Sequence, residues 1–334
     1  MDNHHKSFAA TDRSYLALLK REIHSMAIQL EFPTRRLAEI DLIVAELASN
    51  LVKHATGGEI LVRFFNEANQ SGIELISIDQ GPGIADPTKM LEDGMSTTQT
   101  LGHGLGSIKR LSDTFQIYSQ PDWGTIILSR IYKVIPSRRV SRLDIRSIVV
   151  PKPGETQSGD GFFVETSPER VKLFLGDGLG HGPEAALAVQ TAIEALKASK
   201  EPRPTELIRL LHRAVKKTRG LVGTMGFFDA KTRTWQLCGV GNISTTLKGA
   251  NFAKRHFSYN GIIGMNIPTS MNEQTLVMEA GQYLILCSDG IRSRWETYKY
   301  PHITKYDLSI LAAALYKDYA RKTDDMSIVV CRFN

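Results

Sequence analysis

The stretch LGDGLGHG (Leu175–Gly182) places a carboxylate, Asp177, between glycines at the end of an apolar run, and the second half of the chain is organised around it. A stretch of similar spelling, GHGLGS (Gly102–Ser107), lies in the first half, where His103 stands in place of the aspartate. The elements expected around the two stretches follow in different orders, so they are not copies within a duplicated domain. They predict two different sites.

The composition is that of a globular protein with room for two domains, since 42% of the 334 residues are apolar and 23% are charged. No apolar run reaches the roughly 18 residues of a membrane-spanning helix, and the N-terminus mixes acids and bases where a secretory signal would be apolar. Three cysteines without a CxxC spacing are typical of reduced core residues. We therefore expect a cytoplasmic protein without a membrane partner.

The net charge of +6 could indicate a nucleic-acid partner. The lysines and arginines are scattered, however, and form no basic stripe interleaved with aromatic residues. The sequence therefore favours an acidic or phosphorylated protein partner over nucleic acid.

Hydrophobic periodicity predicts an α/β layer sandwich in the first half. The expected elements are, in order, helices over 15–32 and 35–55, strands over 57–67 and 72–83, a helix over 105–115, and a hairpin over 115–132 that turns at Pro121 and Asp122. A basic, non-periodic segment follows. We expect a first domain over 1–135, a linker over 136–144 and a second domain over 145–334.

The second half predicts an α+β domain with a sheet-rich core, because many short β-rich runs are interrupted by only a few helical stretches. These helices are expected over 183–199, 205–218 and near 307–320.

Four features of the first half fit a nucleotide site. Glu46 and Asn50 are four residues apart and share one helix face, where a carboxylate could activate a hydroxyl and an amide could hold Mg²⁺. Taken alone, such a pair is more often two solvent-facing residues. The remaining features are the strand-end Asp79 with its glycine turn, a glycine-rich helix start suited to anions, and a hydroxyl at the entry to the last strand. Each of these alone also fits an ordinary turn.

In their order and spacing these features resemble the GHKL ATPase superfamily, and within it the anti-sigma-factor serine kinases of the RsbT/RsbW type. The resemblance implies the GHKL (Bergerat) sandwich, with Glu46 as general base and Asn50 as Mg²⁺ ligand. It also implies that ATP is bound by Asp79, Gly81, Gly83, Gly102, Gly104, Gly106 and Thr125.

Acidic residues at the ends of β-rich runs characterise the second half. They are Asp160 in SGDG, Asp177 in LGDGLGHG, Asp289 in CSDG, and Asp324 and Asp325 in TDDMS. A single Asp-Gly is usually a turn. Several of them in one sheet-rich domain can instead converge and hold two hard divalent cations, which activate water for phosphoryl chemistry.

This order of motifs resembles the metal-dependent protein phosphatases (PPM superfamily), in the SpoIIE/RsbX branch. The resemblance implies a PPM-type β-sandwich flanked by helices, with Asp177 as the catalytic residue that bridges two Mn²⁺ or Mg²⁺ ions. It further implies Asp160, the Gly178 carbonyl, Asp289 and Asp324 as the other metal-site residues, Asp160 acting through water, with Asp324 preferred to Asp325. His181 remains a candidate proton donor, although a loop histidine of this kind is more often incidental. There is no arginine ahead of SGDG of the kind that many eukaryotic relatives use to hold the phosphate.

Together the resemblances imply a bacterial partner-switching regulator in which a serine/threonine kinase and the opposing phosphatase act on one STAS-domain protein. One alternative is a phosphatase whose N-terminal half senses ATP and binds a partner without catalysis. Another is a non-enzymatic binding module. Because kinases of this type often pair, a homodimer is also an expectation.

Overall fold

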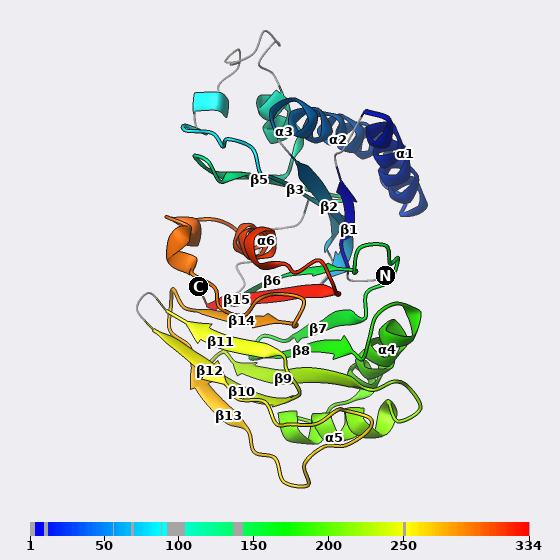
Figure 1. Cartoon of the computed structure of the whole chain (residues 1–334), viewed down its shortest axis with the longest axis vertical. Helices are drawn as coiled ribbons and strands as arrows, with labels where there is room; N and C mark the ends of the chain where they lie inside the picture. Colours follow the sequence, from blue (N-terminus) through cyan, green and yellow to red (C-terminus); the bar gives the residue numbers. More distant parts are fainter. Residues whose placement is uncertain are drawn as a thin grey trace. The chain divides into compact units, whose positions relative to one another are not determined.

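The computed structural model describes residues 4–9, 13–55, 57–67, 70–87, 89–91, 104–135, 143–249 and 252–333 (Figure 1). Contacts between Cα atoms divide the chain into two compact units. The first comprises Met1–Arg138 and Lys305–Ala313, and the second comprises Arg139–Thr304 and Ala314–Asn334. The expected domain limits stay predictions, and most of the expected linker lies outside the described residues.

The first unit is built on one antiparallel sheet with strand order β1-β2-β3-β5-β4. Its elements are β1 (Lys6–Ala9), α1 (Arg13–Gln29), α2 (Thr34–His54), β2 (Gly58–Glu67), β3 (Gln70–Asp79), the 3-10 turn η1 (Lys89–Leu91), α3 (Gly104–Leu111), β4 (Thr114–Gln120) and β5 (Gly124–Tyr132).

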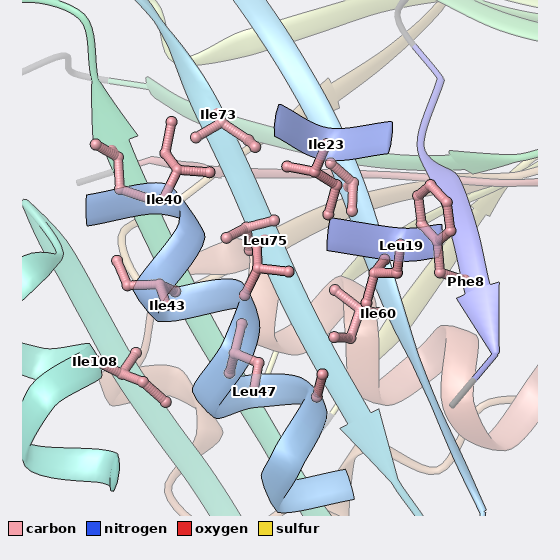
Figure 2. Packing of buried hydrophobic residues seen from close by; sticks show 14 of the residues in the cluster. Phe8, Leu19, Ile23, Ile40, Ile43, Leu47, Ile60, Ile73, Leu75 and Ile108 are labelled. Atoms are coloured by element: carbon pink, nitrogen blue, oxygen red, sulfur yellow. The ribbon is translucent and has the colours of Figure 1, made fainter. Parts of the chain in front are cut away.

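The apolar core of this unit lies between the helices and one face of the sheet, as Figure 2 shows. Its labelled members are Phe8, Leu19, Ile23, Ile40, Ile43, Leu47, Ile60, Ile73, Leu75 and Ile108. In α2 the buried side chains recur at intervals of three or four residues, which places them on one helix face. The polar residues between them, including Glu46 and Asn50, lie at the edges of that face.

A buried charge network occupies the opposite face of the same sheet. Glu74 of β3 and Arg130 of β5 are cross-strand partners, so their side chains share a face. Arg130 donates from Nε to Glu74 at 2.5 Å and from both terminal nitrogens to Asp307 at 2.7 and 2.8 Å. Burial alone would raise the pKa of Glu74, but the adjacent Arg130 outweighs it and holds that pKa well below its usual value. Both charges are therefore retained inside the unit.

From residue 143 onward, apart from Lys305–Ala313, which belong to the first unit, the chain forms a β-sandwich with helices. Its elements are β6 (Leu143–Val150), β7 (Asp160–Thr166), β8 (Arg170–Gly178), α4 (Pro183–Ala198), α5 (Pro204–Ala214), β9 (Leu221–Asp229), β10 (Thr234–Val240), β11 (Ser244–Lys248), β12 (Ala253–His256), β13 (Gln274–Val277), β14 (Tyr283–Cys287), the 3-10 turns η2 (Thr297–Lys299) and η3 (Ile303–Lys305), α6 (Leu308–Tyr319) and β15 (Met326–Phe333).

Two antiparallel sheets, with strand orders β13-β10-β9-β8-β7 and β12-β11-β14-β15-β6, enclose one apolar core that draws on both. A second apolar cluster joins α4 and α5 to the outer face of the first of these sheets (Figure 1). None of the described helices is long and apolar enough to cross a membrane. The α/β class of the first half and the α+β class of the second are both confirmed.

Three of the expected helices end three or four residues earlier than predicted, and the one expected over 15–32 ends at Gln29. The helix expected over 105–115 stops at Leu111, and Phe115 belongs to β4 instead. The backbone N–H of Asp113 donates to the Arg130 carbonyl at 2.9 Å, so pairing with β5 replaces the helical bond. The helix expected over 205–218 likewise ends at Ala214.

Candidate active sites

The first site begins where α2 faces the start of α3. Glu46 and Asn50 are half-buried on the same face of α2. A Cβ atom placed on Gly104 would lie 2.8 Å from Glu46 Oε2 and 3.6 Å from Asn50 Oδ1. The glycine therefore allows the α3 backbone to come directly against the carboxylate and the amide, two residues that the sequence had assigned to one site.

The second part of this site surrounds Asp79, the last residue of β3. Its Oδ1 accepts hydrogen bonds from the backbone N–H groups of Gly81 at 2.8 Å and Thr125 at 3.1 Å. The Thr125 hydroxyl lies 2.9 Å from that of Ser119, which also accepts the N–H of Ile84. The sequence did not single out Ser119, because only the β4–β5 hairpin brings it to this position.

The glycines next to Asp79 are required by close backbone contacts. A Cβ on Gly83, which has a φ of 77°, would lie 1.9 Å from the Gln120 carbonyl oxygen. A Cβ on Gly81 would lie 2.7 Å from the carbonyl oxygen of His54, at the end of α2. The turn after β3 is thus packed against both α2 and the β4–β5 hairpin.

The described residues of this site fit a nucleotide with its magnesium ion. Asn50 Nδ2 is buried and makes no hydrogen bond to any described residue, so this donor is available to an anionic ligand such as a phosphate oxygen, while Oδ1 of the same amide is the atom that could bind Mg²⁺. Gly104 and Gly106 lie in the first turn of α3, whose N–H groups suit phosphate oxygens. Gly102, the remaining predicted glycine, lies outside the described residues.

The second site is at one end of the β-sandwich, where strands of both sheets end. Asp160 begins β7, and Asp177 is its direct cross-strand partner on β8. Their carboxylates therefore share a face. From the other sheet, Asp289 follows β14, and Asp324 precedes β15.

Two neutral side chains that the sequence did not identify hold these carboxylates. The Ser288 hydroxyl donates to Asp160 Oδ2 at 2.6 Å and so links the two sheets. Asn242 Nδ2, from the turn after β10, donates to Asp289 Oδ2 at 2.9 Å. Ser288 is 128 residues away from Asp160 in the chain, and Asn242 is 47 residues away from Asp289. No local sequence pattern therefore reveals either pairing.

Asp325 differs from its neighbour in its surroundings. It is buried, and its two oxygens accept the backbone N–H groups of Lys152 at 2.8 Å and Gly159 at 2.9 Å. It therefore fastens the loop that leads into Asp160. Asp324 is half-buried, and its Oδ1 accepts the N–H of Asp325.

The electrostatics of this end of the sandwich suit divalent cations. Burial, followed by the repulsion of the neighbouring carboxylates, raises the pKa of Asp177 to about 9. Burial also raises the pKa of Asp160 to about 7, against the opposing effect of the hydrogen bond from Ser288. Asp160 Oδ1 is buried and makes no hydrogen bond to any described residue. A Cβ on Gly178 would lie 2.4 Å from the Ala185 carbonyl oxygen, so only glycine fits beside Asp177.

No group of three or more His, Cys, Asp or Glu side chains among the described residues stands in ready-made metal-binding geometry. Asp160, Asp289, Asp324 and Asp325 nevertheless lie near enough to Asp177 to raise its pKa by repulsion. This arrangement is compatible with a cation site, because carboxylates that repel one another need the cation's charge to close around it.

Two further residues next to these motifs have other surroundings. His181 Nδ1 lies 2.7 Å from Glu155 Oε1 on the protein surface. Cys287, ahead of the SDG motif, is completely buried, and burial raises the pKa of its thiol. A buried thiol of this kind is unsuited to act as a nucleophile.

Fold and sites together define a class of protein, a metal-dependent phosphatase domain joined to a GHKL-type ATP-binding domain. Residues 167–334 match the family described as Stage II sporulation protein E (SpoIIE). Residues 8–130 match the family of the histidine kinase-like ATPase domain. The chain belongs to the SpoIIE family, and its N-terminal part belongs to the family of the serine/threonine-protein kinase RsbT. RsbT of Bacillus subtilis (strain 168) is 40% identical over 103 residues, which make up 31% of this chain and 77% of that protein.

Solved structures resemble the chain as well. One, described as "The bacterial stressosome: a modular system that has been adapted to control secondary messenger signaling", is 28% identical, with a TM-score of 0.54, over 57% of this chain and 100% of its own. A crystal structure of RsbX in complex with magnesium shares the fold, with 18% identity and a TM-score of 0.52 over 60% of this chain and 100% of its own.

Proposed function

We propose that the chain is a partner-switching regulator that phosphorylates and dephosphorylates a serine or threonine of one STAS-domain protein in the cytoplasm. The observation that carries the kinase half is the position of Glu46 and Asn50 directly against Gly104 at the start of α3. The similarity to RsbT and to a stressosome structure supports a substrate from the same signalling class.

In the kinase half, Glu46 is the general base. It accepts the proton of the substrate hydroxyl while the oxygen bonds to the γ-phosphorus of ATP and the bond to the leaving ADP breaks. Asn50 would hold the Mg²⁺ ion that neutralises phosphate charge. Asp79, positioned by the Gly81 and Thr125 backbone, would bind the adenine amino group. Gly102, Gly104 and Gly106 would cradle the phosphates.

In the phosphatase half, Asp177, the Gly178 carbonyl, Asp289 and Asp324 would hold two Mn²⁺ or Mg²⁺ ions, with Asp160 acting through water. The ions would supply activated water and positive charge for hydrolysis of the phosphate ester. Ser288 and Asn242 keep the Asp160 and Asp289 carboxylates in position before the ions bind.

Transfer of label from ATP tests the kinase half. With [γ-³²P]ATP, Mg²⁺ and the STAS-domain protein that co-purifies with the chain, the wild type should label that protein, and Glu46→Gln should reduce the initial rate at least 100-fold because it removes the base. Phosphosite mapping should locate the label on serine or threonine. Wild-type protein that binds ATP but transfers no label would contradict the kinase and favour the ATP-sensing alternative.

A further inference from the structure

A basic side chain, Arg219, lies beside the loop that follows Asp177, although the sequence has no arginine ahead of SGDG of the kind that many eukaryotic relatives use. Gly178 of β8 pairs with Leu221 of β9, and the Leu179 N–H donates to the Gly220 carbonyl at 3.1 Å. Arg219, the residue before Gly220, is therefore carried next to the turn that follows Asp177. A Cβ on Gly180 would lie 3.1 Å from Arg219 Nη1, so the guanidinium lies against that turn.

The turn that carries Arg219 is fixed by local hydrogen bonds. Thr218 donates through its backbone N–H and its hydroxyl to the Val215 carbonyl at 3.0 and 2.7 Å, and its hydroxyl accepts the Gly220 N–H at 3.1 Å. Gly220 has a φ of 78°, a conformation that favours glycine. The backbone of this arginine is thus held in place while its side chain stays at the surface.

Arg219 can exchange its ion-pair partner, Glu184, for another anion. Its Nη2 forms an ion pair with Glu184 in the first turn of α4, and the two side chains are 50% and 67% exposed. Exposed pairs of this kind contribute little stability. A phosphate dianion offers a guanidinium two oxygens in the geometry that it binds best.

We propose that Arg219 binds the phosphate group of the substrate in the phosphatase half and that Glu184 competes with that phosphate for it. The inference rests on the proposed phosphatase activity. In this proposal the phosphate-binding cation is the Arg219 guanidinium of the α5–β9 turn. This turn lies on the opposite side of the Asp177 loop from the segment that leads into SGDG, because β8 stands between β9 and β7. Arg219 would offset the negative charge that the cluster of aspartates presents to an incoming phosphate ester.

The test uses the full chain with Mn²⁺, p-nitrophenyl phosphate as substrate and inorganic phosphate as competing ligand. Arg219→Gln should raise KM and the inhibition constant of phosphate about tenfold, with kcat changed less, and Arg219→Lys should recover part of the loss. Glu184→Gln should act in the opposite direction and lower the phosphate inhibition constant two- to threefold. Arg213→Gln, an exposed arginine at the end of α5, is the matched control and should resemble the wild type.

Calorimetric titrations of Mn²⁺, and of phosphate into the Mn²⁺-loaded protein, separate phosphate binding from turnover. Unchanged Mn²⁺ affinity with weakened phosphate binding in Arg219→Gln supports the proposal. An unchanged phosphate affinity overturns it, and so does an equal loss in Arg219→Gln and Glu184→Gln, which would make the ion pair structural. A wild type without Mn²⁺-dependent hydrolysis would contradict the phosphatase instead, and the phosphate titration would still test the arginine.

Discussion

Asp177 and Asp160 show at the scale of single residues how this fold prepares for a cation. The strand pairing brings their carboxylates together, and burial then disfavours the charge on each. The fold alone is thus destabilised at this point near neutral pH. A divalent cation reverses the sign of the interaction, because the same burial then strengthens its attraction to the carboxylates.

Replacing Asp177 by asparagine should separate the cost of this carboxylate from its function. In the unfolded chain an aspartate has a pKa of about 3.9, whereas burial and neighbouring carboxylates raise the folded value to about 9. The stabilisation that comes from the proton bound to Asp177 in the folded state is complete below pH 4 and is lost as the pH rises toward 9. In EDTA, Asp177→Asn should therefore unfold at a higher temperature than the wild type at pH 8. Its advantage in the free energy of unfolding should be larger at pH 8 than at pH 5, by at most about 4 kcal/mol.

Thermal unfolding between pH 5 and 8, with EDTA or Mn²⁺, measures this difference. Mn²⁺ should stabilise the wild type and not the variant, and the variant should lose Mn²⁺-dependent hydrolysis. A difference in melting temperature that does not change with pH would argue against the raised pKa. Hydrolysis that survives the substitution or EDTA would refute the metal assignment.

The sequence identifies the acidic residues of this site but not those that hold them. Asp160, Asp177 and Asp289 could be selected because each stands at a strand end beside glycine. No comparable sequence pattern identifies Asn242 or Arg219, because their proposed roles depend on contacts with residues that are distant in the chain. The buried Glu74–Arg130 pair is equally hidden, because a charged residue in a strand is indistinguishable from a surface residue until its partner strand is placed.

At the scale of elements, the long periodic segments are predictable and the short or competing ones are not. The α2 helix lies within a residue of its expected bounds because its apolar stripe is uninterrupted. The four-residue β1 was not predicted, since so short a strand shows no alternation and is defined only by pairing with β2. Phe115 continues the apolar spacing of α3, yet the hydrogen bonds of the β4–β5 ladder are available to it and place it in a strand.

The turn after β10 should be sensitive to a single methyl group. Gly241 has a φ of 99°, and a Cβ there would lie 2.2 Å from Val222 Cγ1, on a branched side chain that cannot rotate freely. Gly241→Ala should lower the free energy of unfolding by about 3 kcal/mol, from left-handed strain plus overpacking. It should also weaken Mn²⁺ binding, because the displaced turn carries Asn242 away from Asp289.

Gly281→Ala provides the matched control for this substitution. Gly281 has a comparable φ of 81°, but a Cβ there would meet nothing within 4 Å. The control should therefore cost about 1 kcal/mol from backbone strain alone and leave Mn²⁺ affinity unchanged. Urea unfolding and Mn²⁺ titration of both variants make the comparison, and equal costs would show that the contact with Val222 is relieved without strain.

At the scale of the whole molecule, two opposed activities on one chain predict continuous turnover. If both halves act on the same phosphosite, the wild type with ATP, Mg²⁺, Mn²⁺ and the STAS-domain protein should release far more inorganic phosphate than there are phosphosites. Asp177→Asn should instead consume about one ATP per site and stop, because the phosphoprotein accumulates.

An equimolar mixture of Glu46→Gln and Asp177→Asn chains should restore turnover, since the substrate can diffuse from one to the other. Parallel measurement of ADP, phosphate and phosphoprotein follows the cycle, and a mixture that stays at one ATP per site would mean that the two sites do not share a substrate in solution.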